Sequence, residues 1–262
     1  LNSMSELTNY FSILKKRGIK TAIKEIKSRF IRECPRKAVK RIMNVCEKYN
    51  ATFTFYFVAN SAIINREFVK EIIERGHEIG CHGYNHLRFD QMAQEDIIID
   101  LKKAISVFEK MFAYQLSGFR APYLAMNDKI AECLIKLGFV YSSSTAKILP
   151  FKYENLLHEW PITVCDWYTL IRNNQPPSKL YEEMIENAKD TSVFELHPWR
   201  CGQKKYIWIL EEFLKQNKLP CVSNSVLNKS RKGIALTGDI GELSLYEVFL
   251  RSAFKYGTRY KE

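Results

Sequence analysis

Residues 76–86 read Gly-His-Glu-Ile-Gly-Cys-His-Gly-Tyr-Asn-His, so a short strand-length segment is followed at once by two histidines, His82 and His86. Residues four apart lie on adjacent turns when the backbone is helical, and two imidazoles placed in this way can bind one divalent metal ion. A single His-x-x-x-His pattern is more often structural than metal-binding. The metal interpretation therefore depends on what the rest of the chain places beside it.

Three further polar patches each follow an apolar, β-prone run. They are Phe-Arg-Ala-Pro-Tyr at 119–123, Cys-Asp-Trp at 165–167 and Glu-Leu-His-Pro-Trp at 195–199. Arg120, Asp166 and His197 thus fall at the carboxyl ends of predicted strands, which is where a barrel of parallel strands builds its active site. Each residue alone has an ordinary explanation as a surface charge, a strand-end cap or a residue before a Pro turn. Their common placement favours one shared site.

Helical and strand-like patterns alternate from residue 36 onward, which is typical of parallel βα units in an α/β fold. The predicted helices cover residues 36–49, 66–75, 91–112, 128–137 and 204–216, with another after residue 177. The predicted strands cover residues 51–58, 78–80 and 139–142, the runs that precede residues 120, 166 and 197, and a segment near residue 221. Residues 147–158 are predicted to be irregular, and residues 223–233 to form a polar linker.

Together these patches resemble the NodB-homology polysaccharide deacetylases, a carbohydrate esterase family 4-like group, across residues 35–225. That family removes N-acetyl or O-acetyl groups from chitin-like, peptidoglycan-like and related glycans. The resemblance implies a deformed or incomplete (β/α)7-type barrel and metal-assisted hydrolysis of an acyl amide on a sugar. It also implies a divalent, zinc-like or cobalt-like ion held by His82 and His86.

The resemblance further implies roles for the other patches. His197 is expected to protonate the leaving amine, with Asp166 orienting it and keeping it cationic, and Arg120 is expected to position the carboxylate base. The chemistry agrees with these roles for His197 and Asp166, because a carboxylate beside an imidazole favours the charged form of the imidazole. The residues expected to wall the substrate pocket are Tyr123, Trp167 and Leu196.

One family element is missing from its usual place. The family carries a Thr-Phe-Asp-Asp strand end before its first helix, whereas residues 27–34 here contain no Asp, and Glu33 is the carboxylate nearest to that place. Residues 232–241, Lys-Gly-Ile-Ala-Leu-Thr-Gly-Asp-Ile-Gly, echo the missing patch. An ordinary tail strand is the simpler interpretation of this segment. If it docked beside the barrel mouth, however, Asp239 would replace the lost ligand.

Two alternatives to metal-assisted deacetylation follow from the missing patch. One is a metal-independent amidase of the same fold. The other is a catalytically degenerate barrel that binds carbohydrate without turning it over. Within the chain we expect a basic N-terminal segment at residues 1–34, the barrel at 35–225 and a C-terminal tail at 226–262, whose residues 243–254 are again helical.

The net charge of +11 is concentrated near the N-terminus. Residues 1–32 contain eight basic and two acidic residues, and their apolar residues recur at helical spacing, which predicts a basic amphipathic helix. Such a helix either docks on the barrel with a solvated Lys face or contacts an anionic membrane surface. Nucleic acid is the weakest partner, because no nucleic-acid motif accompanies the charge.

The seven cysteines are scattered, without a Cys-x-x-Cys pair, which argues against a disulfide framework and for a reducing compartment. No apolar run approaches the ~18 residues of a membrane span. We therefore expect a cytoplasmic protein, at or near the inner membrane surface. Its expected partner is a carbohydrate substrate, either an amino-sugar glycan or a lipid-linked or nucleotide-linked precursor, and not nucleic acid.

Overall fold

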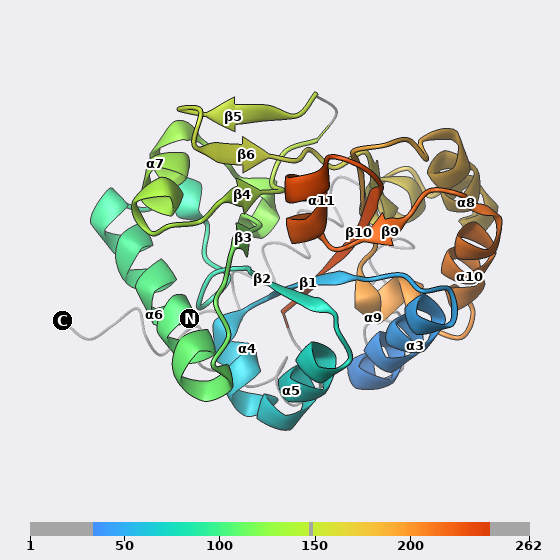
Figure 1. Cartoon of the computed structure of the whole chain (residues 1–262), viewed down its shortest axis with the longest axis horizontal. Helices are drawn as coiled ribbons and strands as arrows, with labels where there is room; N and C mark the ends of the chain where they lie inside the picture. The colour runs from blue at the N-terminus through green and yellow to red at the C-terminus, as the bar shows by residue number, and fades with distance from the viewer. Residues whose placement is uncertain (1–33, 147–148, 242–262) are drawn as a thin grey trace, which may run out of the picture.

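A computed structural model describes residues 34–146 and 149–241, and its strands form one curled sheet (Figure 1). The strand order is β5-β6-β4-β3-β2-β1-β10-β8-β7, with β9 also paired to β10. Neighbouring strands run parallel except β5 and β6, which form an antiparallel pair. The strands are β1 (Thr54–Phe57), β2 (Glu78–Cys81), β3 (Gly118–Phe119), β4 (Tyr141–Ser142), β5 (Phe151–Tyr153), β6 (Leu157–Glu159), β7 (Val164–Cys165), β8 (Ser192–Glu195), β9 (Cys221–Val222) and β10 (Ile234–Ile240).

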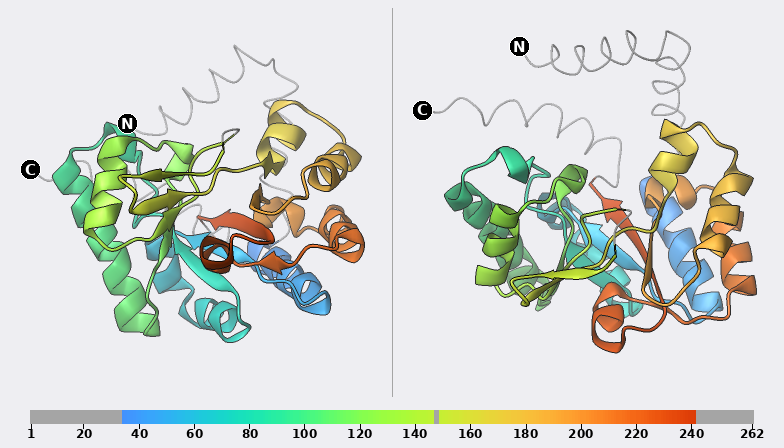
Figure 2. Two further views of the ribbon diagram at one scale, coloured as in Figure 1. Left: turned by 45° about the horizontal axis from the view of Figure 1, so that its top comes forward. Right: turned by 90° about the horizontal axis from the view of Figure 1, so that it is seen from above.

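Helices cover the outside of this sheet in two groups (Figures 1 and 2). The first group is α4 (Ala59–Ile64), α5 (Arg66–Glu74), α6 (Gln94–Phe112) and α7 (Asp128–Lys136). The second is α3 (Pro35–Lys48), α8 (Pro177–Glu186), α9 (Pro198–Cys201) and α10 (Ile207–Gln216). The remaining helices are α11 (Asn224–Ser230), the 3₁₀ turns η1 (Phe89–Gln91) and η2 (Pro122–Leu124), and the π-helix η3 (Trp167–Arg172). The prediction of an incomplete α/β barrel is confirmed.

Three local predictions need correction. Residues 147–158, predicted to be irregular, contain β5 and lead into β6, which form the antiparallel hairpin at one edge of the sheet. Residues 223–233, predicted to be a linker, contain α11. The expected boundary at residue 225 falls inside that helix, and the strand that follows it, β10, lies in the middle of the sheet. The division between barrel and tail therefore does not mark a structural boundary, because β10 completes the sheet.

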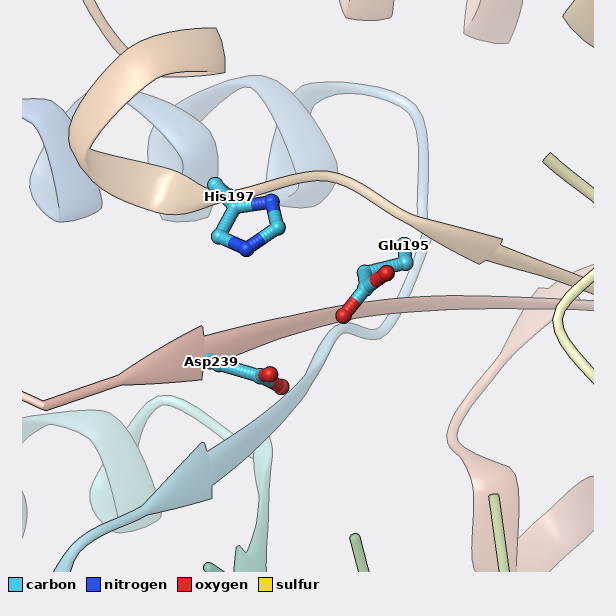
Figure 3. Close-up of side chains that lie close together, drawn as sticks. All are labelled: Glu195, His197 and Asp239. Atoms are coloured by element: carbon cyan, nitrogen blue, oxygen red, sulfur yellow. The ribbon is translucent and has the colours of Figure 1, made fainter. Parts of the chain in front are cut away.

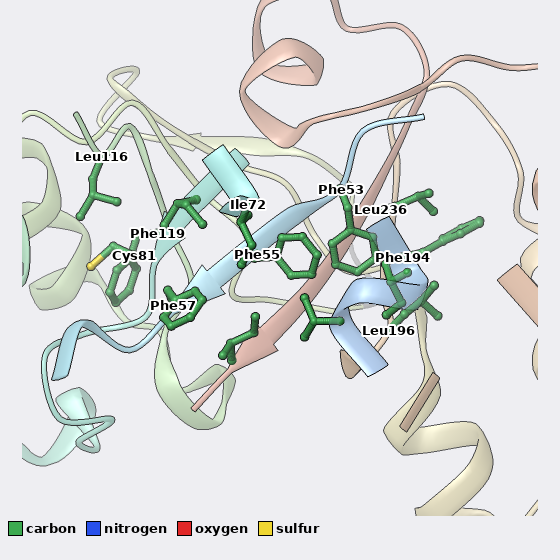
Figure 4. Close-up of a cluster of buried hydrophobic side chains, with 14 of the residues drawn as sticks. Phe53, Phe55, Phe57, Ile72, Cys81, Leu116, Phe119, Phe194, Leu196 and Leu236 are labelled. Atoms are coloured by element: carbon green, nitrogen blue, oxygen red, sulfur yellow. The ribbon is translucent and has the colours of Figure 1, made fainter. Parts of the chain in front are cut away.

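Alternation along β1 separates the two faces of the sheet, since successive side chains of a strand point in opposite directions. Phe53, Phe55 and Phe57 point outward and pack with residues of neighbouring strands and helices, including Ile72 of α5 (Figure 4). All three phenylalanines are fully buried. This aromatic layer holds the outer helices against the sheet and so fixes the strand ends that carry the polar patches.

Two tyrosines fill the inside of the curled sheet. Tyr56 and Tyr141 are both fully buried there. A Cβ atom on Gly80 would lie 2.5 Å from the Tyr56 ring, and one on Gly118 would lie 1.9 Å from the Tyr141 ring. These two glycines therefore make the space into which the tyrosine rings fit.

A buried carboxylate closes the amino end of the barrel. Glu78 accepts hydrogen bonds from the Thr54 hydroxyl at 2.7 Å, the Tyr141 hydroxyl at 2.7 Å and the backbone N–H of Ser225 at 3.1 Å. Because Ser225 belongs to α11, these bonds tie that helix to the strands. The opposite, carboxyl end of the barrel holds the candidate site.

Two chemical predictions can be compared with the described residues. No helix in the ranges 34–146 and 149–241 is long and apolar enough to cross a membrane. All seven cysteines are free thiols, and all but Cys34 are buried. The expected absence of a disulfide framework among these cysteines is therefore confirmed. The predicted N-terminal basic helix and the helix at 243–254 lie outside the described residues.

Candidate active site

The polar residues of the site come from inward-facing positions at the carboxyl ends of adjacent strands. Side chains alternate between the two faces along β8 and β10, and those of Glu195, His197 and Asp239 point to the inside of the barrel. His82 follows β2 and Arg120 follows β3, so they reach the same end from the other side of β1. Strand ends that are far apart in the sequence thus supply one cluster.

His82 is held in one orientation by the backbone. Its Nδ1 lies 2.8 Å from the carbonyl oxygen of Arg120, so the ring donates its Nδ1 proton there. This bond leaves Nε2 facing the site, and Nε2 lies 3.6 Å from Oδ2 of Asp239. The imidazole and the carboxylate therefore face each other at a separation that suits two ligands of one ion.

His86 lies close to His82, but not through a helix. The segment after β2 is a loop, and His86 has a φ of 55°, in the left-handed region that non-glycine residues adopt rarely. Its ring centroid lies 4.8 Å from that of His82 and 4.8 Å from that of Tyr123. The expectation of adjacent helical turns is thus wrong, and a strained loop brings the two imidazoles together instead.

Arg120 is fully buried and almost completely paired. Its Nε donates to the carbonyl oxygen of Ser143 at 2.7 Å, and its Nη2 donates to the hydroxyls of Ser143 and Thr237, both at 2.9 Å. Its Nη1 donates to Oδ1 of Asp239 at 3.1 Å. The guanidinium also lies over the ring of Tyr56, 4.2 Å from its centroid. Arg120 therefore contacts a carboxylate, and its predicted role in positioning the base stays a prediction.

That carboxylate is Asp239, at the end of β10. The segment 232–241 is not an ordinary tail strand, because β10 pairs in parallel with β1 on one side and with β8 on the other. Burial works to raise the pKa of Asp239, but the charges of His82, Arg120 and His197 outweigh it and hold the pKa below its usual value. The next residue, Ile240, is buried and apolar. The site thus receives an ionised carboxylate from a strand late in the sequence, while Glu33 lies outside the described residues.

His197 and Asp166 form a tight pair. Nδ1 of His197 donates to Oδ1 of Asp166 at 2.6 Å, and the thiol of Cys201 lies 3.3 Å from Oδ2. Burial alone would lower the pKa of His197, but the charge and hydrogen bond of Asp166 outweigh it and raise the pKa to about 9. Burial would likewise raise the pKa of Asp166, but His197 in return holds that pKa below its usual value. His197 is therefore cationic at neutral pH, with Nε2 available to the site.

Glu195 is a site residue that the sequence analysis missed. Its carboxyl lies 3.6 Å from Nη1 of Arg120 and accepts the Cys165 thiol at 2.8 Å. Burial, followed by the charge of Asp239, raises the pKa of Glu195. Figure 3 shows Glu195, His197 and Asp239 converging from β8 and β10, and one ligand-type atom from each lies within 4.8 Å of the others. Period-two alternation from His197 would have pointed to Glu195.

The three residues expected to wall the pocket lie in different environments. Tyr123 is 56% exposed and Trp167 is 40% exposed, and the Trp167 ring lies 6.1 Å from that of His197. Both aromatic rings therefore border the open side of the site. Leu196 is only 1% exposed and packs in the hydrophobic core (Figure 4). It does not wall the pocket, because it faces the opposite side of the strand from its neighbours Glu195 and His197.

Comparison with known proteins shows which family the chain resembles. Residues 32–142 match the family model described as polysaccharide deacetylase. This part of the chain is therefore similar to the polysaccharide deacetylase family. Similar proteins include the peptidoglycan-N-acetylglucosamine deacetylase of Bacillus cereus, which is 24% identical over 178 residues, or 68% of this chain and 74% of the relative.

Solved structures agree on the fold. A candidate polysaccharide deacetylase from Mycobacterium smegmatis superposes with a TM-score of 0.61 at 18% identity, over 94% of this chain and 83% of that protein. A CE4 family pseudoenzyme from Bacillus anthracis superposes with a TM-score of 0.55 at 17% identity, over 79% of this chain and 60% of that protein. At these identities the likeness establishes the barrel fold alone.

Proposed function

We propose that this chain hydrolyses an N-acetyl group, or a related acyl amide, on a sugar or glycan precursor. The observation that carries the proposal is the placement of Asp239. An ionised carboxylate, held by Arg120, lies in one cluster with the cationic His197 and with His82. A base and an acid on opposite sides of one small space are what amide hydrolysis requires.

The residues at this end of the barrel fit a divalent ion of the zinc or cobalt type. His82 and Asp239 would hold it, because the Nδ1 contact of His82 aims its Nε2 at Oδ2 of Asp239. His86 would be a further ligand, since its ring centroid lies 4.8 Å from that of His82. Glu195 fits an ion less well, since its carboxyl already faces the Arg120 guanidinium and the Cys165 thiol. His197 also fits poorly, because a cationic imidazole has no lone pair to give. When bound, such an ion acidifies a water molecule and polarises a carbonyl.

The chain's own residues account for the proton transfers. Asp239 accepts a proton from the water whose oxygen attacks the acyl carbon, and Arg120 keeps the carboxylate in place for this step. As the carbon–nitrogen bond breaks, Nε2 of His197 gives its proton to the departing amine, while Asp166 stabilises the imidazolium before the transfer. The products are a free carboxylic acid and the amino sugar. Tyr123 and Trp167 offer exposed aromatic faces to the sugar rings.

One observation favours a second candidate function, a carbohydrate-binding barrel without turnover. The family patch has two adjacent Asp residues, whereas here Asp239 is followed by the buried Ile240. Asp239 then has to serve as both the base and a metal ligand, roles that the resemblance gives to two Asp residues. A metal-independent amidase would use the same Asp239 and His197 without the ion.

Acetate release from a panel of acetylated amino sugars and glycan oligomers tests the proposal, with metal content measured on the same sample. Turnover by the parent that is lost in Asp239→Asn and His197→Ala, together with one bound ion, supports metal-assisted deacetylation. Turnover with no bound ion after loading with excess zinc or cobalt supports the metal-independent amidase. Glycan binding without turnover supports the binding barrel and rejects hydrolysis.

We also propose a cytoplasmic location near an anionic membrane surface and a lipid-linked or nucleotide-linked precursor as substrate. The support is the net charge of +6 carried by residues 1–32, since each basic residue near such a surface contributes on the order of 1 kcal/mol. A deletion of residues 1–32 is expected to reduce salt-sensitive binding to anionic vesicles and to leave activity on a soluble substrate nearly unchanged. Vesicle binding equal to that of the parent would remove this proposal.

A further inference from the structure

We propose that Glu195 is a positioning residue: it anchors the Arg120 guanidinium so that Arg120 holds Asp239 where the base is needed. This inference rests on the proposed hydrolysis. It gives a role to Glu195, for which the sequence predicted none. Glu195 touches no substrate-facing surface itself, because it is 2% exposed and pairs with Thr237, two residues before Asp239 on β10.

The donors of Arg120 show why a second carboxyl is needed. A guanidinium carries five N–H groups in a rigid plane. The Nε hydrogen and both Nη2 hydrogens are taken by Ser143 and Thr237, and one Nη1 hydrogen is taken by Asp239. The remaining Nη1 hydrogen has Glu195 beside it, with Oε1 at 3.6 Å from the nitrogen. Glu195 thus completes the set of partners of a fully buried cation.

Glu195 is itself fixed from the other side. The thiol of Cys165, on β7, lies 2.8 Å from Oε2 of Glu195. A chain of contacts then runs from Cys165 through Glu195 and Arg120 to Asp239, and on to His82. It ties β7 and β8 at one side of the barrel to the ends of β3, β10 and β2. Each member restricts the next, so the carboxylate of Asp239 is held by groups on both sides of its own strand.

Removing Glu195 would therefore act on Asp239 through Arg120. An unpaired N–H of a buried guanidinium is costly, so Arg120 would move to share its Nη1 hydrogens with Asp239. That movement draws the carboxylate away from His82 and the reacting water. A displacement of about 1 Å in a catalytic group can lower the rate by about 100-fold. The loss is expected in kcat, because substrate contacts at Tyr123 and Trp167 are not involved.

Steady-state kinetics of Glu195→Leu and Glu195→Gln test the proposal, with Glu78→Gln as the matched control for a buried carboxylate at the opposite end of the barrel. We expect Glu195→Leu to lower kcat by about 30- to 100-fold with KM within about threefold of the parent value. Glu195→Gln keeps an acceptor for the Nη1 hydrogen and is expected to recover at least about tenfold of that loss. Glu78→Gln is expected to keep the parent kcat.

Two kinetic results would overturn the assignment. One is a Glu195→Leu enzyme with kcat within about threefold of the parent, which would make Glu195 dispensable. The other is loss of the bound zinc or cobalt ion in both Glu195 variants at an ion concentration that saturates the parent, since Glu195 would then be a ligand. An equal fall of kcat in Glu78→Gln would show a general effect of barrel stability, and would also reject the specific role.

A measurement without turnover separates this proposal from the proposed function. The thermal unfolding midpoints of Glu195→Gln, Asp239→Asn and the double variant form a double-mutant cycle, because both side chains contact Nη1 of Arg120. If the chain proves inactive, a midpoint shift of the double variant that differs clearly from the sum of the two single shifts still supports the anchoring role. Additive shifts would reject it.

Discussion

Replacing Asp166 by Asn should disable the proposed acid, His197, without changing the shape of the site. The two side chains are nearly equal in size, and Asp166 is fully buried against the His197 ring. The amide introduced by Asp166→Asn retains an oxygen that can accept the Nδ1 proton, but the substitution removes the negative charge. The charge is what matters here, because it is the main influence that raises the pKa of His197 against the effect of burial.

The size of the effect follows from the pKa of His197. At a pH of about 7.5, an imidazole with a pKa of about 9 is almost fully protonated, whereas one at the ordinary value of 6.5 is protonated in only about one molecule in ten. Without Asp166, burial acts to lower the pKa of His197 further, against the charges of Glu195 and Asp239, which act to raise it. Acetate release should therefore fall at least about tenfold, and the loss can reach the ~10²- to 10⁴-fold that general acid catalysis contributes.

The same pair also contributes to stability. Because the pKa of His197 is raised in the folded chain, its contribution is fully present below pH 6.5 and is lost as the pH rises through about 9. The contribution is on the order of 3 kcal/mol in the parent and should be absent in Asp166→Asn. Urea denaturation at several pH values measures it.

The decisive assay is the pH profile of acetate release, supported by an NMR titration of the His197 ring that needs no turnover. Parent activity should decline above a pH of about 9, and in Asp166→Asn the decline should begin near pH 6.5 or below. Asp190→Asn is the control, because Asp190 accepts a backbone N–H of Gly233 outside the candidate site. An unchanged titration of His197 in Asp166→Asn would refute the reasoning.

Three further changes address other parts of the molecule. His82→Ala should weaken binding of a cobalt ion at least about tenfold, measured by its visible absorption, whereas equal affinity would remove His82 from the metal site. Asp239→Asn should lower acetate release by at least about 100-fold with the fold retained by circular dichroism, and near-parent activity would exclude it as the base. Gly118→Ala should lower the free energy of unfolding by about 1 to 3 kcal/mol, because the new Cβ would lie 1.9 Å from the Tyr141 ring. An unchanged urea midpoint would contradict the packing argument.

The part of the site that could be predicted is local in sequence. Arg120, Asp166 and His197 each follow their own strand directly, so a few residues reveal both the strand and the polar group at its end. Because the strands are parallel, their carboxyl ends lie at one end of the barrel, and this follows without knowing which strands are neighbours. The incomplete barrel was predictable for the same reason, since the alternation of helices and strands is visible in short windows.

The remainder depends on contacts between distant segments. The place of Asp239 is set by the pairing of β10 with β1 and β8, and nothing within residues 232–241 specifies those partners. Leu196 was assigned to the wrong face of its strand and Glu195 was overlooked, although alternation from His197 would have placed both correctly. The hairpin of β5 and β6 was read as irregular because its strands are only three residues long.

The position of β10 also sets the order in which the molecule can be completed during synthesis. Thr54 of β1 pairs with Thr237, which the ribosome adds 183 residues later. At about 5 to 20 residues per second, β1 waits on the order of 10 to 40 s for its partner. Until then the facing edges of β1 and β8 expose unpaired backbone groups that can join other chains. The barrel is therefore most prone to aggregation as a nascent chain, and insertion of β10 ends that period while it brings Asp239, the proposed base, to the site.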